Sequence, residues 1–323
     1  MNDKNNPLLS VRNLTIHYIT DDGLVKAVND ISFDLEKGKT LGLVGETGAG
    51  KTTAAFGIMN LVPDPPGKII SGEILINGKD ILKLKKNESK KYRGKVASMI
   101  LQDPMTALNP IITVGEQIAE VCRLHDKLSK ADAYIKAAQM LELVGIPSDR
   151  IDEYPHQFSG GMKQRVVIAI ALACNPQLLI ADEPTTALDV TIQAQVLSLI
   201  GDLIKKYETS MILITHDLGV VTEICDKVAI MYAGQIVETG DLEAVYEHTK
   251  HPYTKGLFGS LPSLSAKAHR LNPIYGSMPD PTNLPNGCAF HPRCPNKMPA
   301  CENRAPTNTE LESGHFVRCL LYE

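Results

Sequence analysis

The chain lacks the long apolar stretch that a membrane-spanning helix requires. Its longest strongly apolar run covers residues 166–173, whereas a helix needs roughly 20 apolar residues to cross a bilayer. Residues 1–7 are polar and contain no apolar core of the kind found in a secretory signal. We therefore expect a protein of the cytoplasm, either free or bound peripherally to a membrane.

The chain also lacks an excess of basic charge. It has 33 lysine and arginine residues and 37 acidic ones, which gives a net charge of −4. The overall charge of the chain therefore does not attract nucleic acid. It has no internal repeat, no low-complexity tract and no heptad pattern. Hydrophobic residues make up 43% and charged residues 22% of the chain, which is ordinary globular usage. The length of 323 residues predicts about two domains.

Cysteine and proline are distributed unevenly. Four of the seven cysteines (Cys288, Cys294, Cys301 and Cys319) lie near the C-terminus, and ten of the twenty prolines lie between residues 252 and 306. Disulfides are rare in the cytoplasm, so such a cysteine cluster indicates a metal site. The prolines disfavour long regular elements. The change in composition predicts a domain boundary near residue 240.

The rest of the chain alternates between strand and helix patterns. Residues 8–36 alternate between apolar and polar side chains around a turn at residues 21–23, which predicts an antiparallel hairpin. Further strands are predicted at residues 40–44, 73–76, 96–101, 178–181 and 211–214, a hairpin at residues 228–232 and 235–238, and helices within residues 113–144, 160–174 and 191–207. This alternation predicts an α/β fold with a parallel sheet.

A phosphate-binding loop follows the first of these buried strands. It reads Gly45, Glu46, Thr47, Gly48, Ala49, Gly50, Lys51 and Thr52, with Thr53 next in the following helix. The glycines let backbone N–H groups surround phosphate oxygens at the positive end of a helix. Lys51 can reach the β- and γ-phosphates, and the Thr52 hydroxyl can bind Mg²⁺. The motif predicts ATP and Mg²⁺ as ligands.

A second buried strand, at residues 178–181, ends in two carboxylates. Ligand sites of α/β sheets lie at the carboxyl ends of strands, so both acids are expected to face the phosphates. Asp182 would hold Mg²⁺. Glu183 would orient or deprotonate the attacking water. The long gap between this strand and the phosphate loop leaves room for an inserted subdomain.

A third motif, at residues 158–165, specifies the kind of nucleotide enzyme. Ser159 is a natural helix N-cap, and Gly160 and Gly161 leave backbone N–H groups open at the helix start, which makes a second phosphate-binding device. The motif closely resembles the signature sequence of ATP-binding cassette (ABC) ATPases. It departs from that sequence at Phe158, where leucine is commoner, and at Met162, where glutamine is usual.

The resemblance covers about residues 8–240 and implies a P-loop ABC nucleotide-binding domain with an antiparallel β subdomain and a helical subdomain at about residues 103–176. Tyr18 matches the aromatic residue that stacks on adenine. Gln102 matches the Q-loop glutamine, which senses Mg²⁺ and water. Asp189, with residues 187 and 188, matches the D-loop, and His216 matches the switch histidine that contacts the γ-phosphate.

The resemblance also implies partners. Two such domains form a head-to-tail dimer in which each ATP lies between one phosphate loop and the other subunit's signature sequence, and the second subunit is either identical or related. The dimer drives two integral membrane permease subunits at the cytoplasmic face of the membrane, and an extracytoplasmic solute-binding protein acts indirectly. The alternatives are a soluble ABC ATPase acting on nucleic acid or ribosomes, and a regulatory module with an inactive nucleotide site.

Residues 241–323 form the predicted C-terminal extension. Residues 251–257, and the stretch 102–110 after the Q-loop glutamine, resemble ATPases of dipeptide and oligopeptide importers. In that family the cysteine-bearing tail can carry a [4Fe–4S] cluster, which the resemblance implies for Cys288, Cys294, Cys301 and Cys319. Four thiolates suit Zn²⁺ as well, and free thiols are a third alternative. A structural or redox-sensing cluster, and a nickel or glutathione importer, also remain open.

Overall fold

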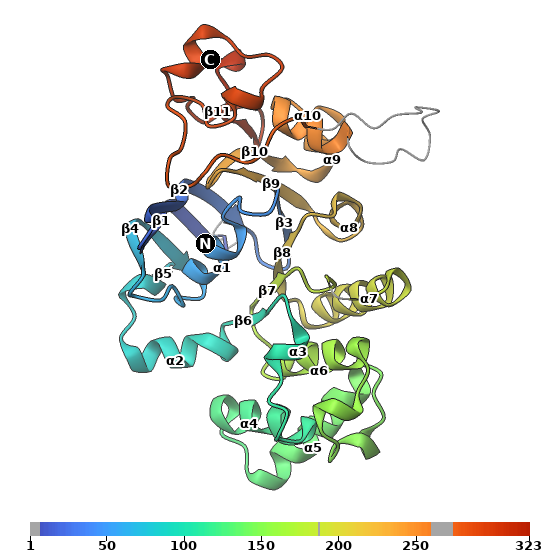
Figure 1. Cartoon of the computed structure of the whole chain (residues 1–323). Coiled ribbons are helices and arrows are strands. Elements are labelled where there is room, and N and C mark those ends of the chain that lie inside the picture. Colours follow the sequence, from blue (N-terminus) through green and yellow to red (C-terminus); the bar gives the residue numbers. More distant parts are fainter. Residues whose placement is uncertain (1–6, 187, 260–273) are drawn as a thin grey trace, which may run out of the picture. The chain divides into compact units, whose positions relative to one another are not determined.

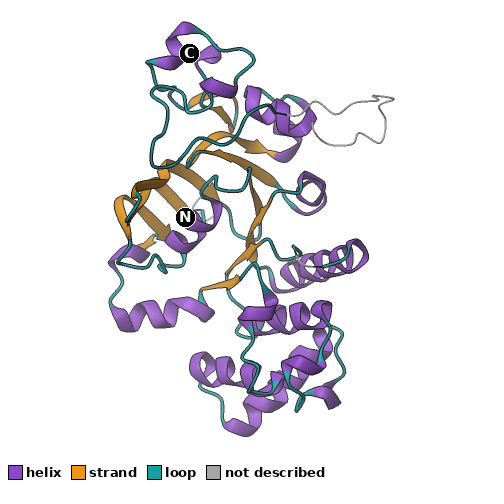
Figure 2. Cartoon of the chain, viewed as in Figure 1, coloured by secondary structure: helices purple, strands orange, loops and turns teal. Residues whose placement is uncertain are grey.

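The computed structural model describes residues 7–186, 188–259 and 274–323 (Figure 1). It divides into two compact units, each built from separate parts of the chain. Unit 1 contains residues 1–35, 40–82 and 214–323 as far as these are described, and unit 2 contains residues 36–39 and 83–213. Most strands belong to unit 1 and most long helices to unit 2 (Figure 2).

Unit 1 contains a four-stranded antiparallel sheet in the order β2-β1-β4-β5. Its hairpin joins β1 to β2 with Thr20 opposite Gly23, at the predicted turn. Leu14 and Ile16 of β1 are fully buried, as the alternating pattern requires. The four strands are β1 (Leu9–Thr20), β2 (Gly23–Leu35), β4 (Gly67–Ile76) and β5 (Lys79–Asp80).

The second group of strands in unit 1 carries the phosphate loop. Strand β3 (Thr40–Val44) is buried at every position and runs parallel to β9 (Lys227–Tyr232). Strand β9 turns into β10 (Gln235–Asp241) to make the predicted antiparallel hairpin. Helix α1 (Lys51–Ile58) begins directly after the loop. Helix α8 (Leu218–Ile224) also belongs to this unit.

The C-terminal tail is more regular than the sequence indicates. Strand β12 (His315–Val317) pairs with β10, and β11 (Thr309–Glu312) pairs with β12. The expectation of an irregular extension is therefore wrong for this segment. A buried side-chain contact accompanies the pairing: His315 Nε2 lies 2.9 Å from Glu238 Oε1, and burial of that carboxylate without polar partners would be costly.

Short helices complete the tail. In the described part of the tail, two α-helices follow β10 and three 3₁₀ turns accompany the cysteine segment and the C-terminus, and all of these elements are short. They are α9 (Leu242–Glu247), α10 (Pro252–Gly259), η5 (His291–Arg293), η6 (Pro299–Glu302) and η7 (Leu320–Tyr322).

Unit 2 combines two parallel strands with a group of helices. Strand β6 (Ala97–Ile100) pairs with β7 (Leu178–Asp182). Strand β8 (Ser210–Thr215) crosses the boundary between the units along the chain. The helices are α2 (Lys86–Lys95), α3 (Pro104–Ala107), α4 (Val114–Asp126), α5 (Lys130–Leu143), α6 (Gly160–Leu172) and α7 (Val190–Tyr207), with 3₁₀ turns η2 (Ile81–Lys83), η3 (Ser148–Arg150) and η4 (Pro155–Gln157) at or near them in sequence.

Helix starts in unit 2 follow their capping residues. Thr113, Ser129, Ser159 and Asp189 each accept a hydrogen bond from the backbone N–H three residues later, which satisfies a donor that the helix itself leaves open. The helical pattern predicted over residues 113–144 is therefore two helices. No helix within the described ranges is long and apolar enough to span a membrane.

Candidate functional site

The phosphate loop of unit 1 is packed tightly against its neighbours. A Cβ atom at Gly45 would lie 2.2 Å from the Met231 carbonyl oxygen. At Gly50, where φ is +99°, a Cβ would lie 2.2 Å from the Ala27 carbonyl oxygen. Real contacts are never so short, so both positions require glycine. The close approach of backbone from β2 and β9 thus explains the glycine spacing that predicted the loop.

Lys51 lies inside this loop. Its Nζ donates to the carbonyl oxygens of Gly45, at 2.7 Å, and Glu46, at 3.1 Å. The residue is only 6% exposed. Because α1 begins at Lys51, the lysine stands at a helix N-terminus, which favours anions. Thr52 is exposed and Thr53 is half-buried.

Two further predicted residues belong to unit 1. Tyr18 lies on β1 opposite Gly67, and its ring would come within 2.7 Å of a Cβ there, so the ring covers that glycine. His216 is exposed directly after β8. Asp217, the next residue, caps α8 by accepting from the Gly219 N–H at 2.8 Å. The cap fixes the backbone that carries His216.

The carboxylate pair lies in unit 2 at the end of β7. Asp182 is buried, at 2% exposure. Glu183 adopts a left-handed backbone conformation, with φ of +44°, which is uncommon outside glycine and typical of functional sites. Gln102 Nε2 donates to Glu183 Oε2 at 2.9 Å. Two residues predicted from separate motifs are therefore brought together.

Thr186 completes this group, and the sequence did not identify it. Its hydroxyl donates to the same Glu183 oxygen at 2.9 Å. The three-residue spacing between the two residues forms a turn, since the Thr186 N–H also donates to the Glu183 carbonyl oxygen at 3.3 Å. That spacing is the signal that would have identified it. Together Gln102 and Thr186 hold one oxygen of the Glu183 carboxylate.

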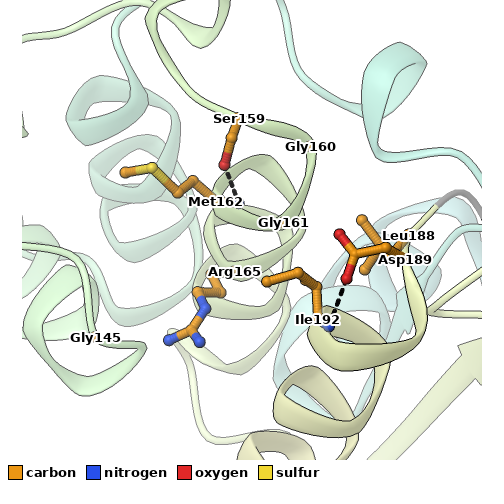
Figure 3. Close-up of a pocket in the computed structure, with 9 residues that line it drawn as sticks. All are labelled: Gly145, Ser159, Gly160, Gly161, Met162, Arg165, Leu188, Asp189 and Ile192. Carbon is orange, nitrogen blue, oxygen red and sulfur yellow. Dashed lines mark hydrogen bonds between the residues drawn. The ribbon is translucent and has the colours of Figure 1, made fainter.

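The signature residues line a pocket of about 630 Å³ in unit 2 (Figure 3). Ser159 caps α6, and its hydroxyl accepts from the Met162 N–H at 3.4 Å. Gly160 and Gly161 lie on one wall, and Asp189 caps α7 on the facing side. The remaining lining residues are Gly145, Met162, Arg165, Leu188 and Ile192. Of the predicted D-loop, Ala187 lies outside the described residues.

Both departures from the family signature contact one arginine. The Arg150 guanidinium carbon lies 4.5 Å from the centre of the Phe158 ring. Arg150 Nη1 also lies 3.5 Å from the Met162 sulfur. Phe158 therefore provides an aromatic face for a cation, which leucine would not. The sequence did not single out Arg150.

Two residues of the tail that the sequence did not place at the loop contact it. Tyr253 Oη accepts a hydrogen bond from the Glu46 N–H at 3.0 Å, and Arg293 forms an ion pair with the Glu46 side chain. No local spacing could have revealed contacts between residues more than 200 positions apart.

The four tail cysteines are close enough to influence one another. Burial, and further the neighbouring thiols of Cys301, Cys319 and Cys294, raise the pKa of Cys288 to about 11. Burial also raises the pKa values of Cys294 and Cys319, with a further contribution from Cys301. The Cys288 N–H donates to the Cys301 carbonyl oxygen at 2.9 Å. The four cysteines therefore lie in one region of unit 1.

The structure does not support a formed metal centre at Cys288, Cys294, Cys301 and Cys319. Among the residues described, no group of three or more His, Cys, Asp or Glu side chains is placed to hold a metal ion. Burial raises the pKa of Cys288 and so favours its protonated thiol in the metal-free chain. A thiol becomes a metal ligand only when it is deprotonated.

Two family models match the chain. The one described as "ABC transporter" matches residues 28–186. The one described as "Oligopeptide/dipeptide transporter, C-terminal region" matches residues 237–301. The first match includes the phosphate loop, the signature sequence and the carboxylate pair, and the second includes the first three tail cysteines.

Curated relatives match nearly the whole chain. The oligopeptide transport ATP-binding protein AppD of Bacillus subtilis (strain 168) is 49% identical over 98% of this chain and 97% of its own length. The oligopeptide transport ATP-binding protein OppD of Escherichia coli (strain K12) is 48% identical over 97% of this chain and 92% of its own length.

A solved structure has the same fold. It is a dimeric post-hydrolysis state of the ATP-binding cassette MJ0796 bound to ADP and Pi, which covers 72% of this chain and 98% of that chain with a TM-score of 0.65 and 24% identity. The same family is indicated by the phosphate loop, the carboxylate pair, the signature helix and the similarity to relatives over nearly the whole chain. The chain belongs to the ATP-binding proteins of ABC transporters, in the group of the oligopeptide and dipeptide transporters.

Proposed function

We propose that this chain hydrolyses ATP to drive the import of dipeptides or oligopeptides. It is an ATPase subunit of a transporter by family. The observation that carries the peptide assignment is that similarity to peptide-transport proteins continues through the tail, where the second family model matches residues 237–301. The same match supports a domain boundary near residue 240, between an ATPase domain (1–240) and an extension (241–323).

In the proposed reaction, unit 1 binds the phosphates. Lys51 Nζ, held by two carbonyl oxygens of its own loop, would move to the β- and γ-phosphates, and the loop N–H groups would bind their oxygens. Thr52 and the buried Asp182 offer the hydroxyl and carboxylate oxygens that Mg²⁺ prefers. When bound, Mg²⁺ neutralises charge on the phosphate oxygens. Tyr18 would stack on the adenine.

Unit 2 would supply the base. Gln102 and Thr186 both donate to Oε2 of Glu183 and so orient its carboxylate, which we propose accepts a proton from water. Gln102 would hold the carboxylate until substrate arrives and then contact Mg²⁺ and water. His216 would donate a hydrogen bond to the γ-phosphate. Orientation of water by a fixed carboxylate contributes about 10²–10⁴-fold to such reactions.

The signature pocket supports a second ATPase subunit as partner. Its volume of about 630 Å³ lies in the range of small-molecule sites, and it presents Ser159, Gly160 and Gly161. We propose that it receives the other subunit's nucleotide in a head-to-tail dimer. Two permease subunits at the cytoplasmic face of the membrane, and indirectly a solute-binding protein, would complete the importer.

The tail cysteines suit a [4Fe–4S] cluster, with Zn²⁺ as the alternative. What supports this is the donor set, which is four cysteines between residues 288 and 319 of the sequence. Such a cluster would staple a segment that has only short helices and strands. Protein purified without oxygen would then contain iron and acid-labile sulfide, and Cys301→Ser would lose both. If metal analysis found one zinc and no iron, the [4Fe–4S] proposal would be wrong and the tail would hold a zinc site.

Transport by the intact system tests the function. The gene would be deleted in its own host, and uptake of a labelled dipeptide, a labelled tetrapeptide, glutathione and nickel would be compared before and after restoring the wild type or Glu183→Gln. We expect peptide uptake to return with the wild type alone. Loss of nickel or glutathione uptake with peptide uptake intact would refute the peptide assignment while leaving the ATPase in place.

A further inference from the structure

One arginine of the tail, Arg293, forms an ion pair with a residue of the phosphate loop. Arg293 Nη1 donates to Glu46 Oε2 at 3.0 Å, and Nη2 donates to Glu46 Oε1 at 3.2 Å. The Arg293 side chain is 6% exposed and that of Glu46 is 30% exposed. A two-pronged arginine–carboxylate pair of this kind is strong and fixes the orientation of both groups. The loop residue Glu46 is thereby tied to the C-terminal region.

Arg293 is itself fixed by its surroundings. Its Nε donates to the Tyr275 carbonyl oxygen at 3.1 Å, and its guanidinium carbon lies 5.7 Å from the centre of the Tyr232 ring. It ends the short helix η5, and Cys294 follows it directly. The position of the arginine therefore depends on the fold of the cysteine segment.

The backbone of Glu46 is held as well. Its N–H donates to Tyr253 Oη, and its carbonyl oxygen accepts from Lys51 Nζ. Tyr253 is fully buried and packs against Phe290 of the tail, with ring centres 5.4 Å apart. Three contacts on one loop residue thus connect the tail to the lysine that binds phosphate.

We propose that Arg293 is a positioning residue: by clamping Glu46 it holds the phosphate loop in its binding conformation, so the C-terminal region sets the nucleotide affinity of the ATPase. Arg293 need not touch the nucleotide. Release of the clamp leaves the loop more conformations to lose when MgATP binds, and the affinity falls accordingly. The proposal rests on nucleotide binding by this loop.

The same tail offers a matched control. Arg318 precedes Cys319 as Arg293 precedes Cys294, and it also pairs with a carboxylate, Asp30 of β2, at 2.8 Å. Asp30 is not part of the phosphate loop. Arg293→Gln and Arg318→Gln therefore both remove a tail ion pair beside a cysteine, and only the first removes the clamp.

The experiment measures binding of MgATP and ATPase kinetics for wild type, Arg293→Gln, Arg293→Lys and Arg318→Gln. We expect Arg293→Gln to raise Kd and KM about tenfold with kcat within about twofold of wild type. Arg293→Lys should keep part of the affinity, because lysine has the charge but not the two parallel donors of the guanidinium group. Arg318→Gln should bind MgATP as wild type does. Equal KM values for the two glutamine variants would overturn the proposal.

Coupling between the two partners gives a second readout. Glu46→Gln and Arg293→Gln break the same contact, so the double variant should bind MgATP no more weakly than the weaker single variant. Additive losses would contradict the clamp. If Arg293→Gln does not fold, Glu46→Gln and Arg293→Lys carry the test.

Hydrogen exchange of the nucleotide-free protein separates failure of the clamp from failure of the ATPase assignment. We expect the loop amides of Arg293→Gln to exchange about tenfold faster than in wild type, with those of α6 unchanged. Wild type that binds no MgATP would refute the ATPase assignment alone. Loop amides as protected in Arg293→Gln as in wild type would refute the clamp.

Discussion

The two glycine-bearing helix starts of this chain are built in different ways. The phosphate loop is confined at both ends: backbone oxygens of Met231 and Ala27 exclude any side chain at Gly45 and Gly50, and tail residues hold Glu46. The signature start is open to a pocket, with Ser159 as its cap, and a Cβ added at Gly160 would lie 3.7 Å from the Leu188 side chain. The phosphate loop is thus fixed by its own protein neighbours, whereas the signature start opens onto the pocket that we propose for the other subunit's nucleotide.

The largest effect should come from Gly50→Ala. The added Cβ would meet the Ala27 carbonyl oxygen at 2.2 Å, in a backbone conformation that alanine resists, so the loop must move. We expect MgATP affinity to fall by at least about 100-fold and the free energy of unfolding to fall by about 2–4 kcal/mol. Equilibrium binding and chemical denaturation measure these changes.

Gly160→Ala is the control for that variant. Its Cβ would make only an ordinary contact with Leu188, so stability and MgATP binding by the phosphate loop should stay unchanged. If Gly160→Ala weakened binding as much as Gly50→Ala does, the contrast between a confined and an open helix start would be wrong.

The second-largest effect should be a loss of stability in acid, caused by the buried His251 next to Tyr253. Burial lowers the pKa of His251 to about 3 from an ordinary 6.5, so the imidazole stays neutral in the fold and accepts from the Tyr253 N–H at 3.0 Å. The unfolded chain binds this proton first. The stabilisation is complete above about pH 6.5 and is lost towards pH 3, at about 1.4 kcal/mol per pH unit.

Denaturation curves between pH 7 and pH 5 check this slope. His251→Gln keeps an acceptor for the Tyr253 N–H but does not titrate, so its stability should depend less on pH in this range. The same slope in variant and wild type would show that other groups cause the acid sensitivity.

The smallest effect should come from the cap of the signature helix. Ser159→Ala removes a hydrogen bond to the Met162 N–H, and Thr113→Ala removes the corresponding bond to the Glu116 N–H, both of 3.4 Å. Each change should cost about 1 kcal/mol of stability. Only Ser159→Ala should also lower kcat, because Ser159 faces the pocket. Equal kcat values for both variants would refute a role of the signature helix start in ATP hydrolysis.

Local spacing accounts for what the sequence predicted correctly. The phosphate loop, the cap at Ser159, the hairpin turn at Gly23 and the carboxylates after β7 each depend on residues within a few positions of one another. The resemblance to ABC ATPases added Gln102, which the structure brings to Glu183.

Contacts across the chain account for what was missed. Glu46 and Arg293 are 247 residues apart, and Glu238 pairs with His315 across 77 residues. Neither pair has a pattern of its own, because an arginine or a buried histidine fits many structures. The β-pairing of the tail and its grip on the phosphate loop become visible only when the chain is folded.

Phosphate release from MgATP by wild type and Glu183→Gln tests the central claim, that a confined loop binds ATP and the Glu183 carboxylate drives its hydrolysis. We predict that wild type turns over, and that Glu183→Gln loses at least about 100-fold in kcat with MgATP affinity within about twofold of wild type. Equal kcat values for the two proteins, or no turnover by either in the assembled transporter, would contradict it.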